Sequence, residues 1–368
     1  MEGNILLPSI IFFLFMMVVL CMYIAYRHEK EIKKLKPLLT RHHKNPLLSP
    51  LADNEWENGA TFNPGAIIDE KGEVHILYRA IGSDGISRIG YSSSEDGIHF
   101  NNRIPFPVFA MDNPRKKVPE SLQRHDPVLY PSGGSWGGCE DPRMVRMEGR
   151  VYVTFNAFDG WDFIRIAAMS IDEKDFFEKR WRWTRPLLIS PENQPNKNWV
   201  LFPEKIDGKF ALLHSISNPE SGAHSEVQID YVDRLEDLSH GRKTIRSKFG
   251  QKEARNAWDT WVRGAGPPPL KTEKGWLVLY HAIDEKDPGK YKIGALLLDP
   301  KNPKKIIGRS PEPLLMPDMW YENDWKPGVV YACGAVVKDE KLFVYYGGGD
   351  KHVCVASASL NEVLQKLV

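Results

Sequence analysis

The sequence has little cysteine and almost no net charge. Its 368 residues include four cysteines and no CxxC pair, so neither a zinc site nor a disulfide framework is expected. The 49 Lys and Arg residues are balanced by 48 Asp and Glu residues. This balance argues against nucleic acid as a partner, because binding to a phosphate backbone depends on clustered basic residues. Aromatic residues are plentiful instead, as in many all-β proteins that handle carbohydrate: 11 Trp, 13 Tyr and 16 Phe.

One long uncharged segment lies near the N-terminus. Residues 6–26 contain no charged side chain, and as a helix they could cross about 30 Å of hydrocarbon. No Lys or Arg precedes this segment, whereas residues 27–50 are rich in both. The positive-inside rule then predicts a cytoplasmic C-terminal part. We expect a tail at 1–5, a single transmembrane anchor at 6–26, a basic juxtamembrane stalk at 27–50 and a catalytic domain at 51–368 that is held at the membrane.

A nine-residue pattern recurs five times in the rest of the chain. Each copy starts at a turn and continues as a run of Val, Leu, Tyr and Phe, which is typical of a β-strand. The copies are GEVHILYRA (72–80), GRVYVTFNA (149–157), GKFALLHSI (208–216), GWLVLYHAI (275–283) and EKLFVYYGG (340–348).

A shorter apolar segment precedes each copy and forms a hairpin with it, and a third strand follows. Five units of this kind predict an all-β chain folded as a five-bladed β-propeller. The starts of the five hairpins would then converge on one central pocket, where loops on a rigid scaffold carry the chemistry.

Six short motifs in these hairpins together resemble glycoside hydrolase family 130. They occur in the order FNPGA, LYRA, EDPR, LFPEK, GAGPPP and YYGG, and the resemblance extends from about residue 45 to the end. That family contains five-bladed propeller enzymes that act on β-mannosides, both phosphorylases and hydrolases. The resemblance therefore implies an enzyme whose substrate is a β-mannoside oligosaccharide or glycan.

The family pattern also implies roles for individual residues. Asp141, in the EDPR motif, would be the general acid and would deliver its proton through a sugar hydroxyl. Asn63 and Arg79 would hold the mannose in the −1 subsite, and Arg143 would brace the acid or contact the sugar. The further candidate substrate contacts are Glu140, Trp161, Asp162, Lys197, Asn198, Lys205, His214 and Asp350.

Inversion at the anomeric carbon requires a nucleophile opposite the acid, either activated water or phosphate. In the family's phosphorylases, basic residues bind phosphate at positions where this chain has Ser215 and Trp261. Arg263 is close, but a shift of one residue along a strand turns a side chain to the other face. The sequence thus favours an inverting hydrolase, with Glu226 or Asp259 as the base.

Two alternatives to hydrolysis remain open at the level of the sequence. The first is a β-mannoside phosphorylase that uses inorganic phosphate as co-substrate and releases mannose 1-phosphate, and a cytoplasmic location would favour it. The second is a non-catalytic propeller that binds glycans through the same face. No further cofactor and no metal are expected under any of these interpretations.

Overall fold

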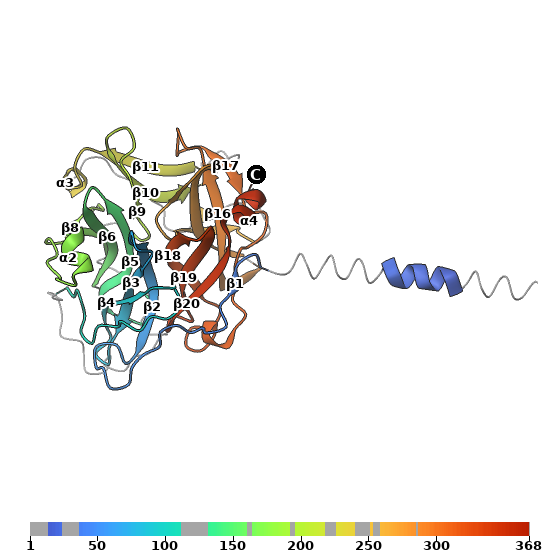
Figure 1. Cartoon of the computed structure of the whole chain (residues 1–368), viewed down its shortest axis with the longest axis horizontal. Coiled ribbons are helices and arrows are strands. Elements are labelled where there is room, and N and C mark those ends of the chain that lie inside the picture. Colours follow the sequence, from blue (N-terminus) through green and yellow to red (C-terminus); the bar gives the residue numbers. More distant parts are fainter. Residues whose placement is uncertain are drawn as a thin grey trace, which may run out of the picture. The chain divides into compact units, whose positions relative to one another are not determined.

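The computed structural model of the chain describes residues 14–23, 37–111, 132–159, 164–191, 196–217, 226–239, 251–252, 258–284 and 286–367 (Figure 1). The chain divides into two units, residues 1–38 and residues 39–368.

The predicted transmembrane anchor is not supported. Within residues 6–26 the structure describes residues 14–23, which are helical. In the described part of the chain, no helix combines the length and the apolar character that a membrane crossing requires. The rest of 6–26 lies outside the described residues. The single-pass membrane location predicted from this segment therefore has no support either.

The second unit is mostly β-structure, and each of the five predicted units is found as an antiparallel set of strands. The five sets are β2 (Ala60–Ile68), β3 (Val74–Ile81) and β4 (Ile86–Ser94); β5 (Gly137–Met147), β6 (Arg150–Asp159) and β7 (Ile164–Asp172); β9 (Val200–Leu201), β10 (Phe210–Ser217) and β11 (Glu226–Val232); β13 (Trp261–Ala265), β15 (Gly275–Asp284) and β16 (Asp287–Leu298); and β18 (Val330–Lys338), β19 (Lys341–Gly348) and β20 (His352–Ser359).

Short elements complete the described unit. The strands are β1 (Thr40–Arg41), β8 (Leu187–Leu188), β12 (Gln251–Lys252), β14 (Leu270–Thr272) and β17 (Ile306–Arg309). The helices are α2 (Glu173–Phe177), α3 (Glu236–Ser239), η2 (Trp320–Glu322) and α4 (Leu360–Leu367).

The prediction of a five-bladed propeller is nevertheless wrong. The described strands form four sheets rather than five, in the orders β2-β3-β4-β5-β6-β7-β8, β11-β10-β9, β12-β13-β15-β16-β17 and β1-β20-β19-β18. The first two sets merge because β4 and β5 pair in parallel, Ile86 with Gly137 and Ser87 with Gly138. None of these sheets closes on itself.

The first strand of four hairpins is interrupted near its beginning by an irregularity in pairing. These interruptions lie between Phe62 and Gly65 in β2, Glu140 and Arg143 in β5, Val262 and Gly264 in β13, and Ala332 and Gly334 in β18. A bulge of this kind leaves residues out of the ladder and re-aims their side chains. In β2 and β5 the interruption contains a proline, which has no N–H to donate to a ladder.

Glycines allow these interrupted strands to approach one another closely. A Cβ atom on Gly65 of β2 would lie 2.5 Å from the backbone oxygen of Pro142 in β5. A Cβ on Gly334 of β18 would lie 2.6 Å from the backbone oxygen of Pro64 in β2. Both distances are shorter than a real Cβ contact, so the backbones meet here only because no side chain intervenes. The interrupted ends of β2, β5 and β18 thereby lie together.

We predict that Gly65→Ala lowers the free energy of unfolding by about 1–3 kcal/mol, because the new methyl group overpacks the contact between β2 and β5. The measurement is urea denaturation followed by fluorescence. Gly289→Ala in β16 is the control, since its Cβ would meet no atom within 4 Å. Equal stability of the two variants would contradict the close approach of these strands.

Candidate active site

A pocket of about 90 Å³, partly open to solvent, lies where the interrupted strands meet. Its lining residues come from four of the five strand sets and from the loops between them: Asn63, Arg79, Ser132, Gly133, Asp141, Lys197, Arg263, Tyr291, Lys326, Val329, Tyr331 and Asp350. Of the sequence-predicted residues, it therefore brings together Asn63, Arg79, Asp141, Lys197 and Asp350.

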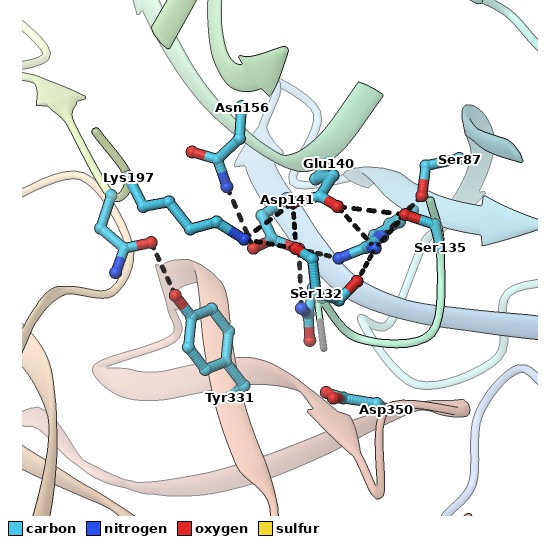
Figure 2. Close-up of polar contacts among 12 residues, drawn as sticks. Ser87, Ser132, Ser135, Glu140, Asp141, Asn156, Lys197, Tyr331 and Asp350 are labelled. Carbon is cyan, nitrogen blue, oxygen red and sulfur yellow. Dashed lines mark hydrogen bonds and ion pairs between the residues drawn. The ribbon is translucent and has the colours of Figure 1, made fainter. Parts of the chain in front are cut away.

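Asp141 lies in the interruption of β5 in a left-handed backbone conformation, with φ of 52°. Asp and Asn adopt this conformation more readily than other non-glycine residues. Its Oδ1 accepts hydrogen bonds from Nδ2 of Asn63 at 2.7 Å and from a guanidinium nitrogen of Arg79 at 3.3 Å. Its Oδ2 accepts one from Nδ2 of Asn156 at 3.3 Å (Figure 2). The carboxylate is thus buried and held on both oxygens by amide and guanidinium groups.

The electrostatic surroundings of Asp141 favour its ionised form. Burial alone would raise the pKa of its carboxyl group. The positive charges of Arg79, Lys197 and Arg143 outweigh burial, so the pKa of Asp141 is lowered below its ordinary value. Without a bound anion, the residue is a carboxylate at neutral pH.

Glu140 lies behind Asp141 and acts as the anchor of the cationic side chains. Its Oε1 accepts a hydrogen bond from Arg79 at 2.9 Å and its Oε2 one from Nζ of Lys197 at 2.9 Å. Ser132 and Ser135 donate their hydroxyl groups to the same carboxylate at 2.8 and 3.1 Å. Figure 2 shows Ser132, Ser135 and Lys197 gathered around Glu140. Glu140 is therefore a positioning residue rather than a lining one.

Arg143 is also buried beneath the pocket rather than in its wall. Its guanidinium donates to the backbone oxygens of Asp141 and Gly266, each at 2.9 Å, and to Oδ1 of Asn198 at 2.8 Å. The hydroxyl of Tyr331 donates to the same Asn198 oxygen at 2.6 Å. Asn198 thus connects the buried Arg143 to Tyr331, which is part of the pocket lining.

Arg263, Tyr291 and Lys326 are lining residues that we did not predict as substrate contacts. The interruption between Val262 and Gly264 leaves Arg263 out of the pairing of β13 with β15. This accounts for its direction, because a rule based on strict alternation does not apply at a bulge. Lys326 forms an ion pair with Asp350 at 3.1 Å. In Figure 2, Asp350 lies apart from the cluster around Asp141.

Three predicted residues have partners away from the pocket and are not among its lining. Oδ2 of Asp259 accepts hydrogen bonds from Tyr280 at 2.7 Å and from Arg309 at 2.6 Å. Lys205 pairs with Glu148 at 2.9 Å. His214 packs against Trp199 with 5.2 Å between ring centroids, and burial lowers its pKa to about 4. Trp161, Asp162 and the side chains of Ser215 and Glu226 lie outside the described part of the chain.

We predict that Glu140→Gln lowers the free energy of unfolding by about 3–5 kcal/mol, because it leaves the buried cations of Arg79 and Lys197 without their carboxylate. The measurement is chemical denaturation at neutral pH. Glu204→Gln is the matched control, since Glu204 pairs with Lys271 at the surface and such pairs contribute at most about 1 kcal/mol. Equal losses in both variants would mean that Glu140 does not anchor the site.

Comparison with known proteins identifies the family. Residues 34–368 match the model of glycoside hydrolase family 130, described as beta-1,4-mannooligosaccharide phosphorylase. A 1,2-beta-oligomannan phosphorylase of Thermoanaerobacter sp. (strain X514) is 34% identical, covering 88% of this chain and 98% of the relative. A beta-1,2-mannobiose phosphorylase of the same strain is 33% identical, covering 86% and 96%.

A solved structure supports the same assignment. Its description says that the GH130 family of mannoside phosphorylases contains glycoside hydrolases that target beta-1,2 mannosidic linkages in Candida mannan. It is 25% identical to this chain with a TM-score of 0.66, covering 87% of this chain and 93% of the other. The chain therefore belongs to glycoside hydrolase family 130 and is an enzyme, a glycoside hydrolase or glycoside phosphorylase.

Proposed function

We propose that the enzyme is an inverting phosphorylase of β-linked mannosides. Inorganic phosphate attacks the anomeric carbon from the face opposite the leaving group, and a new bond from carbon to phosphate oxygen forms as the glycosidic bond breaks. Asp141 gives a proton to the departing oxygen, directly or through a sugar hydroxyl. The products are mannose 1-phosphate and a glycan shortened by one mannose. The observation that carries this proposal is the excess of cationic side chains in the pocket wall.

Four cations and two carboxylates line the pocket: Arg79, Lys197, Arg263 and Lys326 against Asp141 and Asp350. Water as a nucleophile needs a carboxylate base and no cation. A phosphate group carries about 1.5 to 2 negative charges at neutral pH and forms strong charge-assisted hydrogen bonds with Arg and Lys. The composition of the wall therefore favours phosphate as the co-substrate.

The prediction of hydrolysis rested on a shortage of cations and on two possible bases. Arg263 replaces the cation that appeared to be missing near Trp261. Asp259, one of the two predicted bases, is committed to Arg309 and Tyr280 at 2.6 and 2.7 Å, and the side chain of the other, Glu226, lies outside the described part of the chain. Among the carboxylates that line the pocket, Asp350 is paired with Lys326. These contacts weaken the case for an activated water and strengthen the alternative of phosphorolysis.

The relatives suggest which linkage the enzyme accepts. The two at 34% and 33% identity are named for 1,2-beta-oligomannan and beta-1,2-mannobiose, whereas the family model carries the β-1,4 description. Because the two relatives match almost their whole length, we propose β-1,2-linked mannooligosaccharides as the preferred substrates.

The proposed product can be tested directly by incubating the enzyme with β-1,2-mannobiose, with and without inorganic phosphate. We expect mannose 1-phosphate plus mannose only when phosphate is present. Asp141→Asn should lower the rate by about 10²–10⁴-fold, the usual contribution of a general acid. The measurement is chromatographic separation of the products, with β-1,4-mannobiose as the parallel substrate.

Two results would contradict the proposal. Free mannose released at the same rate without phosphate would identify a hydrolase instead. Turnover unaffected by Asp141→Asn would remove Asp141 from the role of acid, whatever the nucleophile.

We predict that Arg263→Gln raises the KM for phosphate by about 10- to 100-fold, because a hydrogen bond to a charged group contributes about 1.5–3 kcal/mol. The KM for the mannoside should change much less. Lys271→Gln is the control, since Lys271 is a surface cation paired with Glu204 at 2.7 Å. Steady-state kinetics in both substrates make the measurement. An unchanged KM for phosphate in Arg263→Gln would exclude Arg263 from phosphate binding.

A further inference from the structure

A second group of polar side chains lies at the turn between β2 and β3. Asp69 follows the end of β2, Glu73 lies in the turn and His75 is on β3. One potential ligand atom from each residue lies within 4.8 Å of the others. We infer that Asp69, Glu73 and His75 bind a divalent transition-metal ion of the Zn²⁺ type, with water completing the coordination.

The imidazole of His75 provides the independent observation that points to a ligand. The residue is only 3% exposed, and its Nε2 atom is buried without a hydrogen-bond partner. A buried nitrogen in this condition is costly, and such atoms are rare in proteins. Nε2 lies 3.7 Å from Oδ2 of Asp69, which is too long for a hydrogen bond. A metal ion between the two atoms would satisfy both.

The other ring nitrogen of His75 has the partner that metal-binding histidines usually have. Nδ1 lies 2.8 Å from the hydroxyl oxygen of Tyr91. When Nδ1 carries the ring proton and donates it to Tyr91, Nε2 presents its lone pair to the cluster, and the ring orientation is fixed. Phe177 of α2 packs on the imidazole with 4.9 Å between ring centroids. The surroundings therefore hold the ring in place.

The charges around the cluster suit a divalent cation. The two carboxylates of Asp69 and Glu73 lie beside the ring nitrogen that has no hydrogen-bond partner. Oδ1 of Asp69 accepts the backbone N–H groups of Lys71 and Glu73 at 2.9 and 2.8 Å, while Oδ2 remains on the side of His75.

The choice of metal follows from the donor set. Zn²⁺ accepts both imidazole nitrogen and carboxylate oxygen as ligands, whereas Mg²⁺ and Ca²⁺ prefer oxygen ligands alone. Tetrahedral Zn²⁺ with bonds of about 2.0–2.1 Å requires ligand atoms roughly 3.3 Å apart. Glu73 and Asp69 are only partly buried, so a small closing movement of the turn would reach this spacing.

The test is metal binding by the full-length protein, with no reference to catalysis. Protein treated with a chelator and then dialysed is titrated with Zn²⁺ by calorimetry, and thermal unfolding is followed with and without the ion. We expect Zn²⁺ to bind this cluster and raise the Tm, and Mg²⁺ to do neither. Glu73→Gln should weaken Zn²⁺ binding by about tenfold or more and abolish the rise in Tm.

Two control variants keep the outcome specific to this cluster. Glu70→Gln changes a carboxylate in the same turn that pairs with Arg146 and should leave Zn²⁺ binding unchanged. The double variant His42→Gln/His43→Gln removes two imidazoles that lie next to each other, with ring centroids 4.4 Å apart. It should likewise bind Zn²⁺ at the cluster.

His75→Gln is expected to behave like Glu73→Gln, and if it fails to fold, Glu73→Gln decides alone. The proposal is overturned if Zn²⁺ gives no rise in Tm, or if Glu73→Gln binds Zn²⁺ as tightly as Glu70→Gln does. In either case His75 and Asp69 would be neighbouring side chains with no metal ion between them. Phosphorolysis is measured separately, so failure of the metal site leaves the proposed function untouched.

Discussion

The buried guanidinium of Arg143 is the interaction on which the site depends most. It donates to the backbone oxygens of Asp141 and Gly266 and to the side chain of Asn198, so a single planar group fixes three segments that are far apart in the sequence. A guanidinium suits this role because its five donors have a rigid geometry and keep their charge when buried. The orientation of Asp141 follows from it, since Arg143 holds the backbone of this residue while Asn63 and Arg79 hold its carboxylate.

A second constraint is the alternation of side chains along a β-strand. Strict alternation would turn every second residue of β2, β5 and β13 away from the pocket. The interruptions in β2, β5 and β13 break the alternation at Asn63, Asp141 and Arg263, and each of these side chains lines the pocket. The regular parts of the same strands carry the core, as Ala66 of β2, Met144 of β5 and Ala265 of β13 do. Within one strand, the regular part therefore packs in the core, and the interruption supplies a side chain to the pocket.

These constraints explain how much could be predicted from the sequence. The strand sets follow from local patterns of apolar residues and turns, and the EDPR motif led to Asp141 through a family resemblance. The pairing of β4 with β5 joins residues about fifty positions apart. No local sequence pattern indicates such a pairing, so the predicted number of sheets was wrong. Arg263 was misjudged because a bulge changes the direction of a side chain without changing composition. His75 was overlooked because, within GEVHILYRA, it occupies an ordinary strand position.

The positive charges of the pocket act both on Asp141 and on the proposed phosphate co-substrate. Two cations of the pocket wall, Arg79 and Lys197, are the positive charges that lower the pKa of Asp141 most. In the empty pocket the acid is therefore ionised and unable to donate a proton. A bound phosphate dianion would offset these charges and raise the pKa of Asp141. Water brings no charge and would leave the acid ionised. If phosphate is the co-substrate, its binding raises the pKa of Asp141 and allows this residue to donate a proton. The same cations that attract phosphate keep Asp141 ionised when phosphate is absent, which disfavours hydrolysis.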